Sequence, residues 1–270
     1  MNCSEAVAYG AVQGISEFLP VSSSAHLMIL GAALNRGDCE SAWYFDLSLQ
    51  FASALAVVVI YSRRILQLLC GLLGKSREGL RLAALLFIAF LPGAICGAAM
   101  DAFNFGRANS IGALGWPLIG GGIYLIFFEK YRRRRRGVKK LSNITVADAI
   151  FIGAMQAVAL IPGVSRSLMS LSACLFIGLA IPNAVEFSFL LGAETISAAV
   201  CYEFLKGNMM AMGSIPLCCT LCGALVAFFF AFPAIKFLRY LLVSNAFISM
   251  AYYRIVLGAL LLSHFYFRLT

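Results

Sequence analysis

A carboxylate, a run of hydroxyls and an imidazole stand close together near the start of an otherwise apolar sequence. The carboxylate is Glu17, the hydroxyls are Ser22, Ser23 and Ser24, and the imidazole is His26. An ionisable side chain inside a membrane is costly and is rarely kept without a function. Glu17 and His26 are therefore candidates for functional residues.

Pro20 separates the carboxylate from the serines and predicts a break between two helices. Serine is a favoured N-cap residue, so the second helix is expected to begin at the serines. The start of a helix has free N–H groups and a partial positive charge, and both attract anions. The stretch therefore predicts a phosphate-binding site.

A second polar break in the sequence carries a cation. It reads Ile161-Pro162-Gly163-Val164-Ser165-Arg166-Ser167. The planar guanidinium of an arginine can hold two phosphate oxygens and stays protonated when it is partly buried. Arg166 is therefore the candidate phosphate clamp, and polar side chains around both breaks are candidate substrate-binding groups. These are Gln13, Ser22, Ser24, Ser165 and Ser167.

The residue types leave two chemical routes open. Ser23 is a candidate nucleophile with His26, three residues on, as its base, but His26 could equally activate water directly. Glu17, with Gln13, could hold a divalent cation such as Mg²⁺ or Ca²⁺, because hard cations prefer oxygen ligands. Each residue also has a purely structural interpretation: an ion pair between Glu17 and Arg166, a helix cap for Ser23 and a packing role for His26.

The composition excludes an ordinary soluble domain. Hydrophobic residues make up 61% of the 270 residues and charged residues only 12%, with a mean hydropathy of +0.90. No basic segment and cleavage site of the signal-peptide type stands at the start, so we expect no removed leader. The nine cysteines fall mostly in apolar runs without zinc-like spacing, and even the pair Cys219 and Cys222 favours neither a metal site nor a redox role.

Six apolar runs are close to the length of about 20 residues that a helix needs to cross a bilayer. They lie near 43–61, 82–100, 111–128, 186–205, 215–235 and 247–267. Two further apolar regions, about 5–34 and 146–181, are interrupted at Pro20 and at Pro162. Each predicts a re-entrant helical hairpin whose broken backbone is buried in protein or lines a wet cavity. We therefore expect an all-α integral membrane protein of ten helical pieces.

Most lysines and arginines lie in the loops 63–81, 130–140 and 236–239, which predicts that these loops are cytoplasmic. Both chain ends and the opening of the first hairpin are then outside, and the second hairpin enters from the cytoplasm. The basic run near 131–140 has no interleaved aromatic residues and no soluble domain beside it, so we expect contact with anionic lipid and no nucleic-acid partner.

The two interrupted regions resemble each other in sequence. Glu5 to Gln13 is similar to Asp148 to Gln156, and the same offset of 143 residues pairs Ser22 with Ser165. A single membrane domain, 1–270, with inverted-repeat halves of about 1–140 and 141–270, is therefore expected. Such an arrangement brings both hairpin tips together near the bilayer midplane, where Arg166 would meet a carboxylate and serines.

These motifs resemble those of the bacterial undecaprenyl-diphosphate phosphatases of the bacitracin-resistance type. The first motif of that family is matched by Gln13, Glu17, Phe18 to Ser23 and His26, and the second by Pro162 to Ser167. Further similarity comes from 186–191 and from 253–258. The chain departs from the family pattern at Ala25 and Leu168, where the family usually has glycine, so the local turns could differ.

The resemblance implies an enzyme that hydrolyses a polyprenyl diphosphate, undecaprenyl diphosphate in the family, to the monophosphate and phosphate. This reaction recycles the lipid carrier for cell-wall glycan synthesis. The implied location is the bacterial inner membrane, with the active site opening to the outer side. An alternative, suggested by the repeat architecture, is a transporter or flippase of polyprenyl phosphate lipids. Oligomeric state, a homodimer included, and the role of Glu194 stay open.

Overall fold

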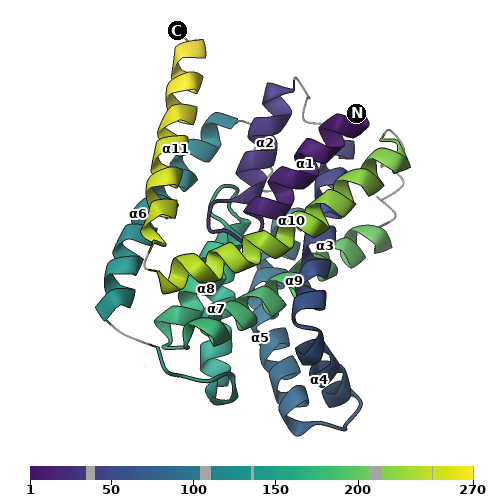
Figure 1. The fold of residues 1–270 in the computed structure, drawn as a ribbon, viewed down its shortest axis with the longest axis vertical. Coiled ribbons are helices and arrows are strands. Elements are labelled where there is room, and N and C mark those ends of the chain that lie inside the picture. Colours follow the sequence, from purple (N-terminus) through teal and green to yellow (C-terminus); the bar gives the residue numbers. More distant parts are fainter. Residues whose placement is uncertain (35–39, 104–110, 135–136, 207–214, 245, 270) are drawn as a thin grey trace.

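The computed structural model describes residues 1–270 apart from 35–39, 104–110, 135–136, 207–214, 245 and 270 (Figure 1). The α-helices are α1 (Cys3–Ser16), α2 (Ser23–Ala33), α3 (Glu40–Ile60), α4 (Ser62–Leu72), α5 (Arg77–Ala102), α6 (Gly115–Arg134), α7 (Val146–Ala157), α8 (Arg166–Phe176), α9 (Ile181–Leu205), α10 (Leu217–Val243) and α11 (Ile248–Leu269). Short 3₁₀ turns precede α6 and α7 and follow α7, at Ile111–Leu114, Leu141–Asn143 and Val158–Leu160.

The described residues form helices and no β-strand, which confirms the expected all-α class. Five helices are long and apolar enough to cross a membrane: α3, α5, α6, α9 and α10. The predicted sixth span corresponds to α11, whose described apolar part, 248–264, falls in the class of shorter apolar helices. The chain is therefore a multi-pass helical membrane protein, and its described residues contain five helices that could each cross the bilayer.

The basic residues near 63–81 predict a cytoplasmic loop, but residues 62–72 form helix α4. Arg63 and Arg64 lie in its first turn, and its exposed leucines recur at helical spacing at Leu66, Leu69 and Leu72. The helix packs on the start of α5, where a Cβ atom added at Gly71 would lie 2.1 Å from the backbone nitrogen of Leu80. In Figure 1 this pair lies at the end of the molecule opposite the N-terminus.

Both predicted breaks are present, and they are built alike. The helix before each break, α1 or α7, begins with a capping box, formed by Asn2 with Glu5 and by Thr145 with Asp148. The helix after each break begins directly after a serine with a positive φ, 72° at Ser22 and 80° at Ser165. The 143-residue offset seen in the sequence therefore relates matching backbone features in the two halves.

Each of these two leading helices packs closely on a long helix through a glycine. A Cβ atom at Gly10 of α1 would lie 2.2 Å from the carbonyl oxygen of Gly223 in α10. The equivalent Gly153 of α7 would place its Cβ 2.2 Å from the carbonyl oxygen of Ala89 in α5. The absence of a side chain at these positions lets the helix backbones approach closely, as small residues do in membrane helix pairs.

Arg254 of α11 ties the two breaks together. Its side chain is fully buried, and its Nη1 atom donates a hydrogen bond of 2.9 Å to the carbonyl oxygen of Pro20 in the first break. Its Nη2 atom donates to the carbonyl oxygens of Gly163, at 2.9 Å, and Val164, at 3.1 Å, in the second break. Gly121 of α6 makes room for the guanidinium, since a Cβ there would lie 2.1 Å from Nη2. The guanidinium of Arg254 therefore donates hydrogen bonds to backbone carbonyl groups in both halves of the chain.

We expect Arg254→Lys to destabilise the protein, because an ammonium group cannot reach carbonyls on both breaks at once. Each hydrogen bond of a charged group that is lost costs about 1.5–3 kcal/mol. Thermal unfolding in detergent measures the effect, with Arg239→Lys, at an exposed position of α10, as the matched control. Equal melting temperatures for the two variants would contradict a stabilising role for the hydrogen bonds between Arg254 and the two breaks.

Candidate active site

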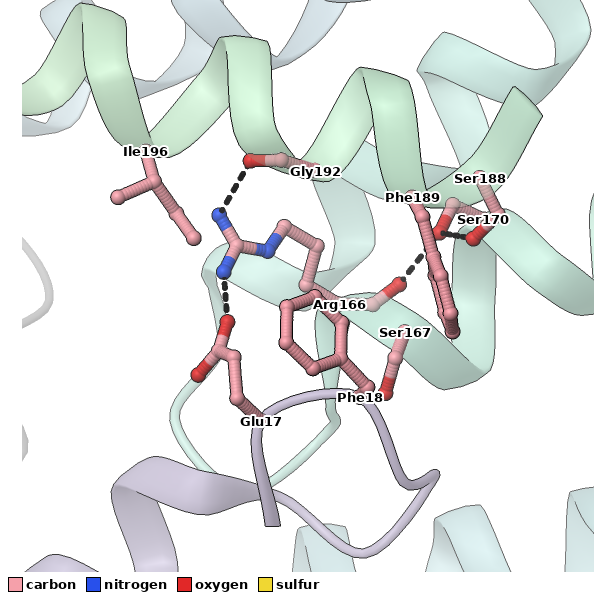
Figure 2. Close-up of a pocket in the computed structure, with 9 residues that line it drawn as sticks. All are labelled: Glu17, Phe18, Arg166, Ser167, Ser170, Ser188, Phe189, Gly192 and Ile196. Carbon is pink, nitrogen blue, oxygen red and sulfur yellow. Dashed lines mark hydrogen bonds and ion pairs between the residues drawn. The ribbon is translucent and has the colours of Figure 1, made fainter. Parts of the chain in front are cut away.

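Glu17 lies at the centre of a polar cluster formed where the two breaks meet (Figure 2). Its carboxylate accepts hydrogen bonds of 2.7 Å from Gln13 Nε2 and 2.7 Å from Ser23 Oγ. Nη2 of Arg166 forms an ion pair with its other oxygen. The carboxylate is nearly fully buried, with 3% of the side chain exposed. A buried carboxylate is thus matched by one cation and two neutral donors, as a buried charge requires.

Local structure explains how these groups come together. Glu17 caps the end of α1 and lies four residues after Gln13, on the same helix face. Ser23 is the first residue of α2, so the turn through Pro20 returns its hydroxyl to Glu17. Arg166 is the first residue of α8, directly after the second break. The expected meeting of Arg166 with a carboxylate is present in the structure.

The space beside this cluster is small. It is lined by Glu17, Phe18, Arg166, Ser167, Ser170, Ser188, Phe189, Gly192 and Ile196. Its volume is about 10 Å³, close to the minimum that one water molecule needs. The rings of Phe18 and Phe189 pack with centroids 4.9 Å apart and form an apolar wall. The cavity as it stands is too small for a phosphate group.

The four flanking serines form two equivalent pairs. The hydroxyl oxygens of Ser22 and Ser24 lie 3.2 Å apart, and those of Ser165 and Ser167 lie 3.0 Å apart. Ser167 also donates a hydrogen bond of 2.8 Å to a carbonyl oxygen of the first break, and Ser165 accepts one of 3.3 Å from the backbone of α8 as its N-cap. The structure thus gives Ser165 a capping contact and leaves Ser24 exposed to a ligand.

His26 does not contact Ser23 in this structure. One ring nitrogen, Nδ1, lies 2.7 Å from the carbonyl oxygen of Ser22, and Nε2 lies 2.6 Å from the hydroxyl oxygen of Tyr253 in α11. The two rings are stacked with centroids 5.6 Å apart. The expected serine–histidine hydrogen bond is therefore not among the contacts of the described residues, since α2 begins at Ser23 and turns the imidazole toward α11.

The donor set around Glu17 suits a hard divalent cation. Gln13 is fully buried, and its amide oxygen Oε1 has no hydrogen-bond partner among the described residues. That oxygen and the carboxylate beside it are the ligand types that Mg²⁺ prefers, and Mg²⁺ often takes one or two protein ligands together with substrate phosphates. Gln13 and Glu17 therefore offer the ligand types of the expected ion, and Gln13 would have to turn Oε1 in place of Nε2 toward the carboxylate to hold it.

Glu194 lies in α9, two residues from the pocket residue Gly192. Its Oε2 atom is buried without a hydrogen-bond partner among the described residues. The adjacent Thr195 accepts a hydrogen bond of 3.0 Å from Gln156 Nε2, which joins α9 to α7. Among the described residues, no hydrogen bond or ion pair joins Glu194 to the cluster around Glu17, and the structure gives it no role in that cluster.

Sequence reasoning missed the positioning role of Tyr253, and it gave Arg254, an arginine inside an apolar segment, a role in supporting the fold. Tyr253 holds the imidazole of His26, and Arg254 holds both breaks. Both lie in α11, more than 220 residues from the first motif, and their contacts have no local pattern. The signal for Tyr253 was its occurrence among the residues that resemble the family, and Arg254 also stands out as a charge inside an apolar run.

The sequence of this chain was compared with family models and with known proteins. The family model described as "Bacitracin resistance protein BacA" matches residues 6–260. A protein named undecaprenyl-diphosphatase from Sorangium cellulosum is 38% identical over 267 residues, which cover 96% of this chain and 85% of the relative. Proteins of the same name from Aromatoleum aromaticum and Moorella thermoacetica are each 35% identical; the latter alignment covers 99% of this chain and 100% of the relative. Since the family model spans nearly the whole chain and the relatives align along almost all of it, this chain belongs to the bacitracin resistance protein BacA family.

Proposed function

We propose that this protein is a membrane undecaprenyl-diphosphate phosphatase, which converts the diphosphate to the monophosphate and phosphate and so recycles the carrier for cell-wall glycan synthesis. The observation that carries the proposal is the buried contact of Glu17 with both Ser23 and Arg166, inside an apolar helical body. Such a site suits a substrate with an anionic head and a long apolar tail. The names of the relatives support the same substrate.

Arg166 is the phosphate clamp in this proposal. In the structure its Nη2 atom faces Glu17, while Nη1 makes only a long hydrogen bond of 3.4 Å to the carbonyl oxygen of Gly192. A terminal phosphate can replace the weak contact with Gly192 and, by displacing Glu17 from Nη2, engage the guanidinium through two oxygens. The ion pair with Glu17 then keeps the arginine charged and in place while the site is without substrate.

The reaction proceeds on the terminal phosphorus. Ser23 Oγ attacks it, the bridging P–O bond breaks, and the electron pair leaves with the polyprenyl monophosphate. The hydroxyl proton passes to Glu17, which already accepts the Ser23 hydrogen bond at 2.7 Å. Water then attacks the phosphoserine and releases phosphate, and the serine regains its proton. In the competing route, His26 activates water for direct attack and Ser23 only binds phosphate.

A divalent cation, Mg²⁺ or Ca²⁺, would be held by Gln13 and Glu17 and would neutralise charge on the diphosphate. Both side chains are buried and face each other across a hydrogen bond of 2.7 Å. Ser22 and Ser24 add hydroxyl donors near the phosphate, and Ser167 would do so only by giving up its hydrogen bond to the carbonyl oxygen of Leu19.

The membrane arrangement in this proposal has six spans and two re-entrant hairpins, α1–α2 and α7–α8, related by an inverted repeat. The matched capping boxes, positive-φ serines and glycine contacts support the repeat. We place the protein in the inner membrane with the active site open to the outer side. Because inverted repeats with broken helices also occur in transporters, movement of polyprenyl phosphate lipids is the second candidate function.

The first test is release of phosphate from a polyprenyl diphosphate by the protein in detergent, with and without divalent cations. We expect release that depends on the cation and falls at least about tenfold in Arg166→Lys, since one charged hydrogen bond is worth about 1.5–3 kcal/mol. Arg77→Lys, at an exposed position, is the matched control. Translocation of lipid in vesicles without phosphate release would favour the transporter.

The second test separates the two chemical routes. If Ser23 is the nucleophile, rapid-quench experiments with a labelled terminal phosphate trap a labelled enzyme, and Ser23→Ala lowers turnover by more than about a thousandfold. If Ser23 only binds phosphate, the loss is about ten- to a hundredfold and no label is trapped. Ser249→Ala, an exposed serine of α11, controls for the substitution itself.

The third test concerns orientation. On a cysteine-free background, Val138→Cys should be protected from an impermeant external reagent in intact cells, and Phe103→Cys should react with it. Both positions are highly exposed, 84% and 80%, so burial cannot explain a difference. External labelling of Val138→Cys would place the active site on the wrong side for the proposed reaction.

A further inference from the structure

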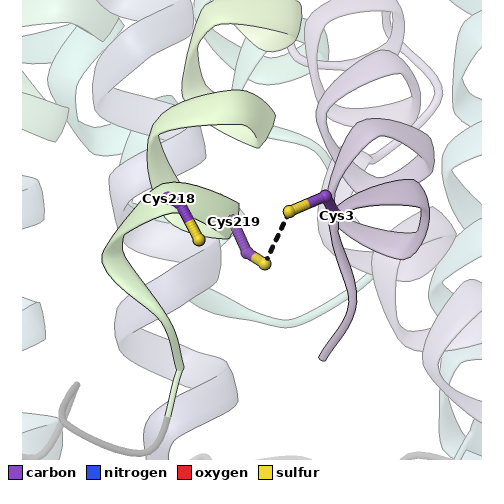
Figure 3. A group of neighbouring side chains, drawn as sticks. All are labelled: Cys3, Cys218 and Cys219. Atoms are coloured by element: carbon purple, nitrogen blue, oxygen red, sulfur yellow. Dashed lines mark hydrogen bonds between the residues drawn. The ribbon is translucent and has the colours of Figure 1, made fainter.

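Three thiols from distant parts of the sequence meet at the starts of two helices (Figure 3). Cys3 is the first residue of α1, and Cys218 and Cys219 lie in the first turn of α10. The sulfur atoms of Cys3 and Cys219 are 3.0 Å apart, and all three sulfur atoms lie within 4.8 Å of one another. The sequence spacing disfavours a metal site because more than 200 residues separate Cys3 from the other two.

The separations suit three ligands of one metal ion. A metal–thiolate bond is about 2.3 Å long, so tetrahedral or trigonal angles place the sulfurs about 3.8–4 Å apart. The observed group needs only a small opening of the pair Cys3 and Cys219 to reach this geometry. A disulfide between those two would leave Cys218 unused.

The surroundings permit entry of an ion. The three thiols lie at the N-termini of α1 and α10, and a metal ion bound there would displace the thiol protons. Cys3 and Cys218 are exposed, whereas Cys219 is buried. An ion can therefore reach the site from solvent and be held on its inner side by Cys219.

We propose that Cys3, Cys218 and Cys219 bind one thiophilic metal ion of the Zn²⁺ or Cd²⁺ class, with a fourth position left to solvent or another donor. Binding replaces up to three thiol protons with three metal–sulfur bonds and changes no oxidation state. The bound ion joins the start of α1 to the start of α10. Because α1 carries Gln13 and Glu17 near its other end, the site fixes the helix that presents the catalytic carboxylate.

Cadmium is the probe, since its thiolate complexes have an ultraviolet charge-transfer absorption. The full-length protein, in detergent with a non-thiol reductant, is titrated with Cd²⁺ in competition with a chelator. We expect one ion per chain, protection of the three cysteines from maleimide, and competition by Zn²⁺. The variants Cys3→Ser, Cys218→Ser and Cys219→Ser should each weaken Cd²⁺ binding by more than about a hundredfold, because loss of an outer-shell partner alone costs 10–100-fold.

The matched control is Cys222→Ser, which removes a cysteine one turn further along α10, outside the group of three. It should leave the absorption and the affinity unchanged. An absorption that is missing, or that survives Cys3→Ser, would overturn the proposal. So would an intact mass two hydrogens lower before reduction with no Cd²⁺ binding after it, because that result assigns Cys3 and Cys219 to a disulfide instead. Circular dichroism of every variant checks that the helices are retained.

Discussion

The structure depends on hydrogen-bond partners for the backbone groups that are freed where helices break inside an apolar helical body. Each break interrupts the internal hydrogen bonds of a helix, and the freed carbonyl groups have no water to pair with at membrane depth. The guanidinium of Arg254 donates hydrogen bonds to carbonyl oxygens of both breaks, and the absence of a side chain at Gly121 leaves room for it. The two breaks are consequently held against each other, and Glu17, Ser23 and Arg166 are brought into contact.

The position of the candidate active site follows from that constraint. Glu17 ends one broken helix and Arg166 begins another, so fixing the breaks also fixes the distance between the two charges. The serines flank the same two helix starts for the same reason. The scaffold therefore supplies the electrostatic match, and the apolar walls formed by Phe18 and Phe189 keep the space around the charges small.

The sequence predicts features that depend on neighbouring residues or on the internal repeat, and it does not predict contacts between distant helices. Helix breaks, the serine N-caps and the meeting of Glu17 with Arg166 could be predicted, because proline, serine and a repeated segment have local or symmetric consequences. The partner of His26 could not, since Tyr253 reaches it only through the packing of α11 on α2. Helix α4 was missed because its charged first turn has the composition of a cytoplasmic loop.

The positive φ angles at Ser22 and Ser165 bear on how such a site evolves. A non-glycine residue in this region is strained by about 1–3 kcal/mol, and glycine would relieve the strain. Serine nevertheless stands at both positions, and each hydroxyl lies within hydrogen-bond distance of another serine in its own break. The protein thus keeps two locally unfavourable conformations and with them two hydroxyls beside the candidate active site. Selection for thermal stability alone would drive both positions toward glycine, and selection for turnover would oppose it.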